Sequence, residues 1–428
     1  MKKLPKSYGG VYMGRKNKPS KQVDFIRIGG IFFIVLSIVL FGEVDTVEAE
    51  SNKDTLVYTS TESVLDKSYE ELIDSLDQDM FADYFSTLEM GHSYIIPGLD
   101  KTNIRNEKVC SGMIPQGICV AGEYLIISAY DKSHMVTNSA LHKSQYKQKS
   151  VLYVMDVESR QYLTTITLDT TCHVGALAYN PDDEIIYVAD SANGVVQRLS
   201  LEGIKACVES GNDAGEDVLG FDFEAIDTMG YTPSFLAYYQ DHLYVGQFAR
   251  MNPKELFSNQ MVVFDQNGVL IEQDTITIPH YAQGVAFADW KEETYMLISA
   301  SYGRNRPAAL SVYLMESQDD GSVKRKRKVG KFACPNMSED IDIQGDSLYT
   351  CYESASNFYR LSLDNNGESS NVVDRIMVSS VKKTIAKIVT GDAERYIERI
   401  TELPIQYMEH GIVRMDVDDR RRLFLRLS

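Results

Sequence analysis

One short phrase recurs five times between residues 113 and 379, and it constrains the fold more than any other feature of this 428-residue chain. Each copy has a small or polar opening, then an apolar run, a turn and a second apolar run of β type. Counted from Gln116 through His173, Pro233 and Gln283 to Glu339, the copies are 57, 60, 50 and 56 residues apart. A repeat of about 40–50 residues that holds four strands is typical of a β-propeller blade.

The repeat predicts an all-β fold, a β-propeller of six blades, with five blades as the alternative and with flanking N- and C-terminal helices. A sixth copy of the phrase spans residues 410–425, and a blade there needs outer strands from the N-terminal segment. The run Tyr94-Ile95-Ile96 is expected to add an outer strand to the last blade and close the ring. We expect three regions: residues 1–49, residues 50–112, and a propeller over 113–428 with a helical insertion near 382–403.

Several elements are predicted in more detail. Ser68 and Glu71 have the spacing of a capping box, and apolar residues recur every three or four positions as far as Leu88, which predicts an amphipathic helix over 68–90. A second helix is predicted over 392–403. In the fifth repeat, 359–363 and 374–379 are predicted strands. The basic tetrad 324–327 is expected on a solvated outer strand or hairpin tip.

The N-terminal segment has the composition of an export signal. Residues 1–27 carry eight Lys or Arg and one acid, and residues 28–42 form an uncharged, largely apolar run. Small residues around Ala49 suit cleavage after residue 49, whereas an uncleaved anchor at 28–42 is the alternative, although a membrane span usually needs about 20 residues. We therefore expect a secreted or cell-surface, extracytoplasmic protein that meets the membrane only through this segment.

Charge and cysteine content limit the partners and the cross-links. The formal net charge is −18, and without the +7 of residues 1–27 it becomes −25, so nucleic acid and anionic lipid are not expected partners. Six cysteines permit up to three disulfides in an exported chain, of which at most one or two are expected. No pair of cysteines has the CxxC spacing of a zinc site.

Propeller topology predicts where a ligand site lies. The first strand of each blade begins on the face where the second strand ends, so phrase openings and second-strand ends surround one mouth of the axial channel. A concave polar mouth on a rigid ring is the default ligand site of such a fold. The residues expected to bind a ligand there are Gln116, Tyr130, His173, Asp190, Gln283, Tyr302, Glu339 and Glu353.

Three residues of this mouth are candidates for further chemistry. The neutral imidazole of His173 suits a general base or a metal ligand, with a hydrogen-bonded channel histidine as the alternative. Glu339 is the second catalytic candidate, and Glu339 and Asp340 are the candidate oxygen ligands of a divalent metal. Adjacent acids in a strand point to opposite sides, so only one of the two is expected to face the channel. The glutamines and tyrosines of the mouth suit hydrogen bonding and stacking.

The repeats also carry a family resemblance. Residues 115–120, 128–131, 151–156, 173–175 and 337–339 resemble phrases of exported bacterial β-propeller proteins of unassigned activity, within the broad group of six-bladed propellers that includes NHL-repeat proteins and gluconolactonase-like enzymes. The resemblance to the enzymes implies a divalent metal held by acidic and Asn ligands in the channel. Glu339 matches such a ligand, whereas Gln116, His173 and Gln283 depart from the pattern.

Three functional interpretations follow from these observations. The first is an extracytoplasmic binding or interaction platform that holds a protein or carbohydrate-like ligand at the channel mouth. The alternative is a metal-dependent, gluconolactonase-like hydrolase or lyase that acts on a small or carbohydrate-like substrate. The third is a scaffold that binds other envelope proteins through the 68–90 helix.

Overall fold

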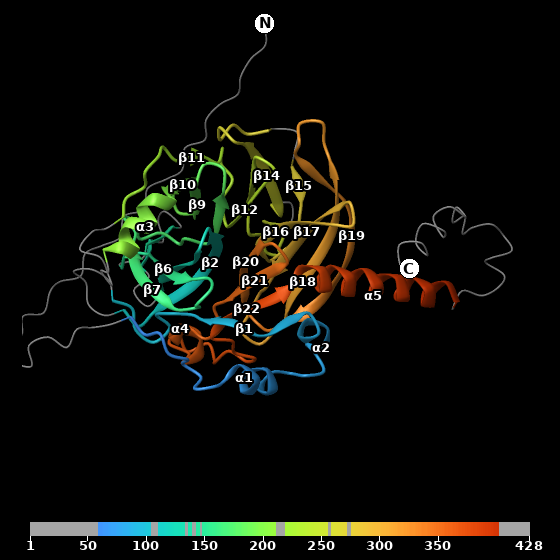
Figure 1. Cartoon of the computed structure of the whole chain (residues 1–428), viewed down its shortest axis with the longest axis horizontal. Helices are drawn as coiled ribbons and strands as arrows, with labels where there is room; N and C mark the ends of the chain where they lie inside the picture. The colour runs from blue at the N-terminus through green and yellow to red at the C-terminus, as the bar shows by residue number, and fades with distance from the viewer. Residues whose placement is uncertain are drawn as a thin grey trace, which may run out of the picture. The chain divides into compact units, whose positions relative to one another are not determined.

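A computed structural model gives the arrangement of the repeats. It describes residues 59–103, 110–132, 136–138, 143–145, 148–210, 219–255, 258–271 and 275–401, with the side chains of 136–138, 143–145 and 392–401 left out. Strand pairing forms five four-stranded antiparallel sheets, which are arranged as the blades of a propeller (Figure 1). The predicted β-propeller class is therefore confirmed.

Each blade is a meander of consecutive strands, and the first strand of the chain completes the last one. The blades consist of β2 (Met113–Ala121), β3 (Tyr124–Asp131), β6 (Val151–Asp156) and β7 (Tyr162–Thr167); β8 (Leu177–Asn180), β9 (Ile185–Asp190), β10 (Val195–Ser200) and β11 (Ile226–Asp227); β12 (Phe235–Tyr239), β13 (His242–Gly246), β14 (Gln260–Asp265) and β15 (Ile276–Thr277); β16 (Ala282–Trp290), β17 (Glu293–Ala300), β18 (Ala308–Ser317) and β19 (Val323–Cys334); and β20 (Ser338–Gln344), β21 (Ser347–Tyr352), β22 (Arg375–Ser380) and β1 (Leu88–Ile95).

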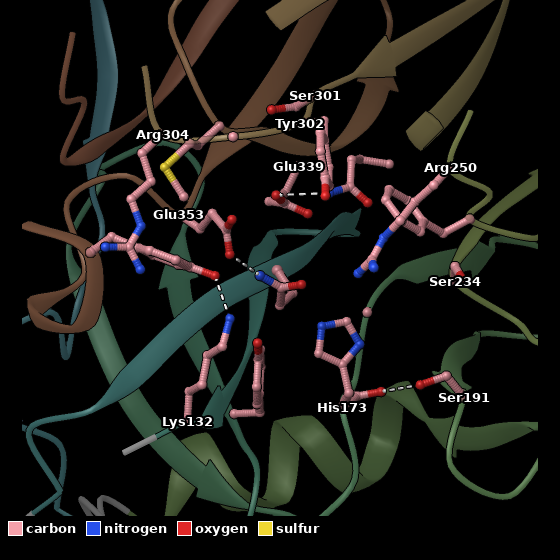
Figure 2. Close-up of a pocket in the computed structure, with 18 of the residues that line it drawn as sticks. Lys132, His173, Ser191, Ser234, Arg250, Ser301, Tyr302, Arg304, Glu339 and Glu353 are labelled. Carbon is pink, nitrogen blue, oxygen red and sulfur yellow. Dashed lines mark hydrogen bonds between the residues drawn. The ribbon is translucent and has the colours of Figure 1, made fainter. Parts of the chain in front are cut away.

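The ring closes with five blades. The first strands contact one another in the order β2, β8, β12, β16 and β20, and β20 contacts β2 again. This circle leaves no gap for another blade, so the structure has the five blades of the alternative rather than six. The predicted sixth copy at 410–425 lies outside the described residues. On one face, the beginnings of the inner strands surround a cavity (Figure 2).

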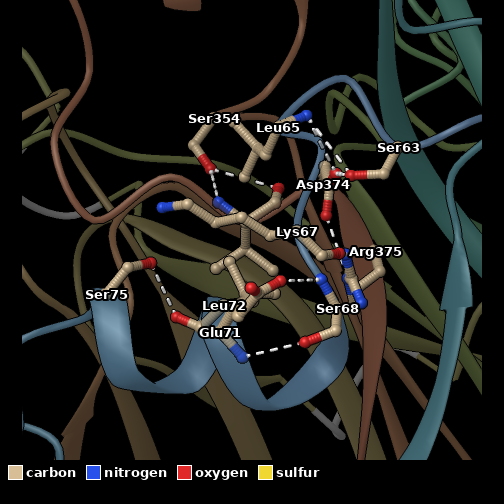
Figure 3. Close-up of polar contacts among 11 residues, drawn as sticks. Ser63, Leu65, Lys67, Ser68, Glu71, Leu72, Ser75, Ser354, Asp374 and Arg375 are labelled. Atoms are coloured by element: carbon tan, nitrogen blue, oxygen red, sulfur yellow. Dashed lines mark hydrogen bonds and ion pairs between the residues drawn. The ribbon is translucent and has the colours of Figure 1, made fainter.

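The N-terminal segment supplies the outer strand of the last blade, as predicted. β1 pairs antiparallel with β22, with Tyr94 opposite Ile376. The chain before β1 is fastened to the same blade through Asp374 (Figure 3). Its carboxylate accepts hydrogen bonds from Ser63 Oγ at 2.5 Å and from the buried Arg375 Nε at 2.9 Å. These bonds let β1 cover the edge of β22, which would otherwise be open to pairing with another strand.

The helix predicted over 68–90 is wrong in its extent. The capping box of Ser68 and Glu71 is confirmed, but α1 covers only Tyr69–Ser75, α2 covers Ala82–Phe85, and β1 begins at Leu88. Leu72, Leu76, Phe81, Tyr84 and Leu88 are all buried in one core cluster with the fourth and fifth blades. Because pairing of β1 with β22 competes with helix formation, the regularly spaced apolar residues lie on two short helices and a strand.

The remaining elements differ from prediction in detail. Residues 359–363, predicted as a strand, begin within the short helix α4 (Asn357–Arg360), and β22 is the third strand of that blade. The C-terminal helix α5 (Val381–Thr401) starts eleven residues before the predicted 392 and packs on β19. Two elements were not predicted: α3 (Leu201–Glu209) and a hairpin of β4 (Val136–Asn138) and β5 (Lys143–Gln145). The basic tetrad 324–327 lies exposed on the outer strand β19, as predicted.

Cys119, Cys172, Cys334 and Cys351 are buried free thiols. No helix within the described residues is both long enough and apolar enough to cross a bilayer.

Glycines permit the close approach of the inner strands at the axis. A Cβ at Gly117 of β2 would lie 2.6 Å from the backbone of Ala176, next to β8, and a Cβ at Gly284 of β16 would lie 2.6 Å from Cα of Asp340. Only a residue without a side chain fits these contacts. The glycine of the phrase is therefore a packing requirement of the narrow ring.

Replacing Gly117 by alanine is expected to lower the free energy of unfolding by about 1–3 kcal/mol, the usual cost of overpacking an interior. The added methyl group forces β2 and β8 apart. Urea unfolding followed by circular dichroism measures the change. Gly220→Ala is the matched control, because a Cβ there meets no atom within 4 Å. Equal effects of the two substitutions would show that the inner strands are not tightly packed.

Candidate functional site

The cavity at the channel mouth has a volume of about 800 Å³ and is lined by residues from all five blades (Figure 2). It brings together seven of the residues expected to bind a ligand: Gln116, Tyr130, His173, Gln283, Tyr302, Glu339 and Glu353. These residues are far apart in the sequence and meet because the blades repeat around one axis. A cavity of this size is large enough for a small organic ligand.

Irregular pairing at the strand beginnings turns side chains into the cavity. The register shifts between Pro115 and Ile118 in β2, and corresponding shifts occur at the start of β16 and of β20. A β-bulge leaves an extra residue that does not follow the regular alternation of side chains. In these three strands the affected residues include Gln116, Gln283 and Glu339, which all line the cavity.

Asp340 lies deeper, at the axis, and does not line the cavity. It occupies the phrase position that is glycine in β2 and β16, and its Oδ2 accepts from the backbone N of Ile118 at 3.2 Å and of Leu177 at 3.3 Å. The side chain thus joins the inner strands of three blades. Of the two adjacent acids, only Glu339 lines the cavity.

Asp190, which was expected to bind a ligand, also points elsewhere. Its side chain is buried and accepts from the backbone N of Asn193 at 3.1 Å, from Asn193 Nδ2 at 2.7 Å and from Gln197 Nε2 at 3.3 Å. These bonds hold the turn between β9 and β10. The neighbouring Ser191 lines the cavity instead, and its hydroxyl donates to the carbonyl of His173 at 3.4 Å.

Glu339 and Glu353 form a carboxyl pair on the cavity wall. Gln283 Nε2 donates to Glu339 Oε1 at 3.1 Å, and Gln116 Nε2 donates to Glu353 Oε2 at 3.0 Å. Burial raises the pKa of Glu339 well above its usual value, and the charge of Glu353 raises it further. Burial also raises the pKa of Glu353, against the opposing effect of the Lys132 ammonium. The pair therefore titrates as a unit, and both carboxyl groups ionise less readily than an exposed glutamate.

Two of the cationic side chains in the cavity have partners. Lys132 Nζ donates to Tyr359 Oη at 2.7 Å and lies 4.9 Å from the ring centre of Phe358. Arg304 forms an ion pair with Asp364 at 2.5 Å and stacks 4.8 Å from the ring centre of Tyr359. These contacts hold both cations on the same side of the cavity, next to the carboxyl pair (Figure 2).

His173 is a neutral base at physiological pH. Burial lowers its pKa to about 4, and the positive charge of Lys132 acts in the same direction. The ring of Tyr130 meets the imidazole edge-on, with 4.4 Å between ring centres. A neutral imidazole offers one nitrogen acceptor and one N–H donor to a bound molecule.

Arg250 points into the cavity from the opposite side (Figure 2). Its guanidinium lies 6.0 Å from the ring centre of Phe248 and 5.7 Å from that of Tyr302. Tyr302 in turn stacks on Tyr281, with 4.6 Å between ring centres and 18° between planes. The result is an aromatic surface that carries a cation at its edge.

Sequence reasoning did not predict Lys132 or Arg250 at the mouth. A signal for them exists, because an aromatic residue, any residue and a basic residue follow one another near the end of the second strand in three blades. The three triplets are Tyr130-Asp131-Lys132, Phe248-Ala249-Arg250 and Tyr302-Gly303-Arg304. Their aromatic and basic members all line the cavity.

The donors of the cavity fit a divalent metal poorly. Glu339 and Glu353 already accept from amide groups, burial raises the pKa of both, and the Lys132 ammonium is close enough to affect both pKa values. A metal ion bound there would need both carboxyl groups to ionise against these raised pKa values and would lie near the ammonium. In the described part of the chain, no three His, Cys, Asp or Glu side chains are grouped for metal binding.

The strand pairing and this cavity define a class: a β-propeller with a polar, ligand-sized cavity at one channel mouth. No protein-family model and no curated protein matches the chain. Solved structures that resemble it include hydrazine synthase of Kuenenia stuttgartiensis, at 13% identity, TM-score 0.32 and 58% coverage of each chain.

Two further solved structures are similarly distant. One is a chain of a nidogen/laminin complex, at 11% identity and TM-score 0.32, with 59% of this chain and 80% of that chain covered. The other is a catalytically inactive virginiamycin B lyase from Staphylococcus aureus with quinupristin, at 10% identity and TM-score 0.28, with 65% of this chain and 98% of that chain covered. At sequence identities this low, the similarity concerns the fold alone.

The carboxyl pair predicts a pH dependence of stability. An acid whose pKa is raised by folding binds its proton more tightly in the folded state, so its contribution to stability falls as the pH rises from about 4.5 toward the raised value. Glu339→Gln removes the charge and keeps an acceptor for Gln283. We expect it to unfold with a free energy about 1–2 kcal/mol above wild type at pH 8, with the difference vanishing near pH 4.

Urea unfolding between pH 4 and pH 8 measures this difference. Glu70→Gln, on the exposed face of α1, is the control and should show no such trend. A difference between Glu339→Gln and wild type that stays constant with pH would rule out a raised pKa of Glu339.

Proposed function

We propose that this chain is an extracytoplasmic binding propeller that holds a small, carbohydrate-like ligand in the axial cavity. The observation that carries the proposal is the convergence of polar and aromatic side chains from five blades on one cavity of about 800 Å³. Ligand sites usually combine apolar surface with a few placed polar groups. The basic segment and apolar run of residues 1–42 support an export signal and hence a ligand met outside the cytoplasm.

The chemistry of the lining favours a hydroxyl-rich molecule. Gln116, Gln283 and neutral His173 present both donors and acceptors, and Ser191, Ser234 and Ser301 add hydroxyl groups. Tyr302 is 44% exposed and is supported from behind by Tyr281, so it offers a rigid apolar surface to a sugar ring. Since the side chains are already hydrogen-bonded within the rigid ring, a ligand meets a preformed site.

Tyr302→Ala is expected to weaken the binding of any carbohydrate that the wild type binds by at least tenfold, because it removes this surface. Saturation-transfer NMR and calorimetry with a panel of neutral and charged sugars measure the binding. Phe223→Ala is the matched control, because Phe223 is 43% exposed and lies outside the cavity. Failure of the whole panel to bind, or equal binding by wild type and Tyr302→Ala, would refute the proposal.

One observation favours a second candidate, a hydrolase or lyase that acts on a similar substrate. The neutral base His173 and the carboxyl pair of Glu339 and Glu353, whose pKa values are raised, line the same cavity, as a base and an acid of a reaction would. The divalent metal expected from the family resemblance would belong to this candidate, although the donor set described above suits it poorly.

Elemental analysis of the purified protein decides between the two candidates. The binding propeller predicts no stoichiometric calcium, magnesium or zinc and an unchanged melting temperature in chelator. A near-stoichiometric metal that is lost in Glu339→Ala or His173→Ala would favour the metal-dependent enzyme, and lactone and polysaccharide substrates would then be assayed. Glu70→Ala is the control for loss of a carboxylate elsewhere.

A further inference from the structure

Three blades present the same pair of side chains to the cavity. The triplets that end at Lys132, Arg250 and Arg304 each place one aromatic ring and one cation on the wall. The chain as a whole is acidic, with 61 Asp and Glu against 43 Lys and Arg. A repeated basic feature in one cavity of an acidic protein points to the charge of what binds there.

The three cations differ in how they are compensated. Lys132 is bonded to Tyr359 and faces the carboxyl pair, and Arg304 is paired with Asp364. Among the residues that the structure describes, the Arg250 guanidinium has no ion pair and no hydrogen bond, and its recorded contacts are the rings of Phe248 and Tyr302. Arg250 is therefore a cation held on aromatic surface with its donors unused.

The Glu255 carboxylate is engaged within the same loop, and hydrogen bonds from Asn252 and from the Arg250 backbone lower its pKa more than the Arg250 charge does. Glu255 Oε2 accepts from the backbone N of Arg250 at 2.7 Å, and Asn252 Nδ2 donates to Glu255 Oε1 at 3.0 Å. The loop is further fixed by the bond from Tyr281 N to the carbonyl of Ala249 at 2.8 Å. These bonds hold the loop in place while the guanidinium stays available at the cavity (Figure 2).

We propose that the ligand of the axial cavity is an acidic sugar whose carboxylate binds the guanidinium of Arg250, while its hydroxyl groups bind the neutral side chains around it. This inference rests on the proposed carbohydrate-binding function and adds the charge and the residue that recognises it. A guanidinium presents parallel N–H groups that match a carboxylate in a bidentate pair. Stacking on Phe248 and Tyr302 orients that fork before the ligand arrives.

A carboxylate fits the site better than a phosphate. A phosphate monoester carries nearly two negative charges at pH 7 and three strongly accepting oxygens. Compensating it would require a second unpaired cation, but Lys132 and Arg304 are already engaged on the far side of the cavity. One guanidinium without an ion pair matches one single negative charge.

The test uses three probes that differ only at C6: glucose, glucuronate and glucose 6-phosphate, with the galactose series beside them. Binding to the full-length protein is measured by saturation-transfer NMR and calorimetry. We expect the sugar acid of at least one series to bind at least tenfold more tightly than its neutral sugar. In Arg250→Gln the ratio of the two affinities should fall to within twofold.

Arg306→Gln is the matched control, because Arg306 lies in the same loop as Arg304, is exposed and does not line the cavity. It should keep the tenfold preference, whereas loss of the preference in both variants would assign it to the general field of the protein and overturn the role of Arg250. Arg250→Lys should retain part of the preference, since it keeps the charge without the fork.

The outcomes separate the two proposals. Equal binding of neutral and acidic sugars would overturn the inference and leave the carbohydrate-binding function standing. Tighter binding of the 6-phosphate than of the uronate would overturn the carboxylate in favour of a phosphate. Absence of binding in both series would overturn the acidic sugar together with the function on which it rests.

Discussion

The close approach of the inner strands at the propeller axis is the constraint on which the rest of the structure depends. Backbone meets backbone at Gly117 and Gly284, and in the fifth blade Asp340 replaces the glycine and bonds to the amides of two other blades. Five blades fit around so narrow an axis, and the space there is filled by this buried carboxyl group. The buried Asp340 side chain therefore lies at the axis, deeper than the cavity at the mouth.

The close approach of the inner strands also determines the electrostatics of the cavity. Residues that start the inner strands are forced close together and out of water, so Glu339 and Glu353 cannot both ionise at low cost, and His173 stays neutral. Their amide and ammonium partners come from different blades. Packing of the ring and protonation of the site are thus linked, because a change in blade spacing would alter both.

The repeat could be predicted from the sequence because each blade carries its own phrase. The channel mouth, the capping box at Ser68 and the ring-closing strand could be predicted as well. The number of blades could not be predicted, because it depends on how closely the strands pack around the axis, and no single repeat reveals that packing. The prediction of one helix over 68–90 is wrong because pairing of β1 with β22 outcompeted local helix propensity. Asp190 does not line the cavity, since turn hydrogen bonds hold its side chain, and Arg250 was missed because it lies four residues beyond the end of β13.

The charged groups of the cavity have to be considered together with the charge of the whole chain. A protein with a net charge of −18 repels an anion at long range, so an acidic ligand gains nothing from electrostatic steering. Recognition must then come from contacts within the cavity, where solvent screens charges less than at the surface. An oriented guanidinium on aromatic rings supplies such a contact, and the raised pKa values of Glu339 and Glu353 disfavour negative charge on the opposite wall. Burial of the acids and exposure of the arginine thus act in the same direction, because both favour an anion in the cavity.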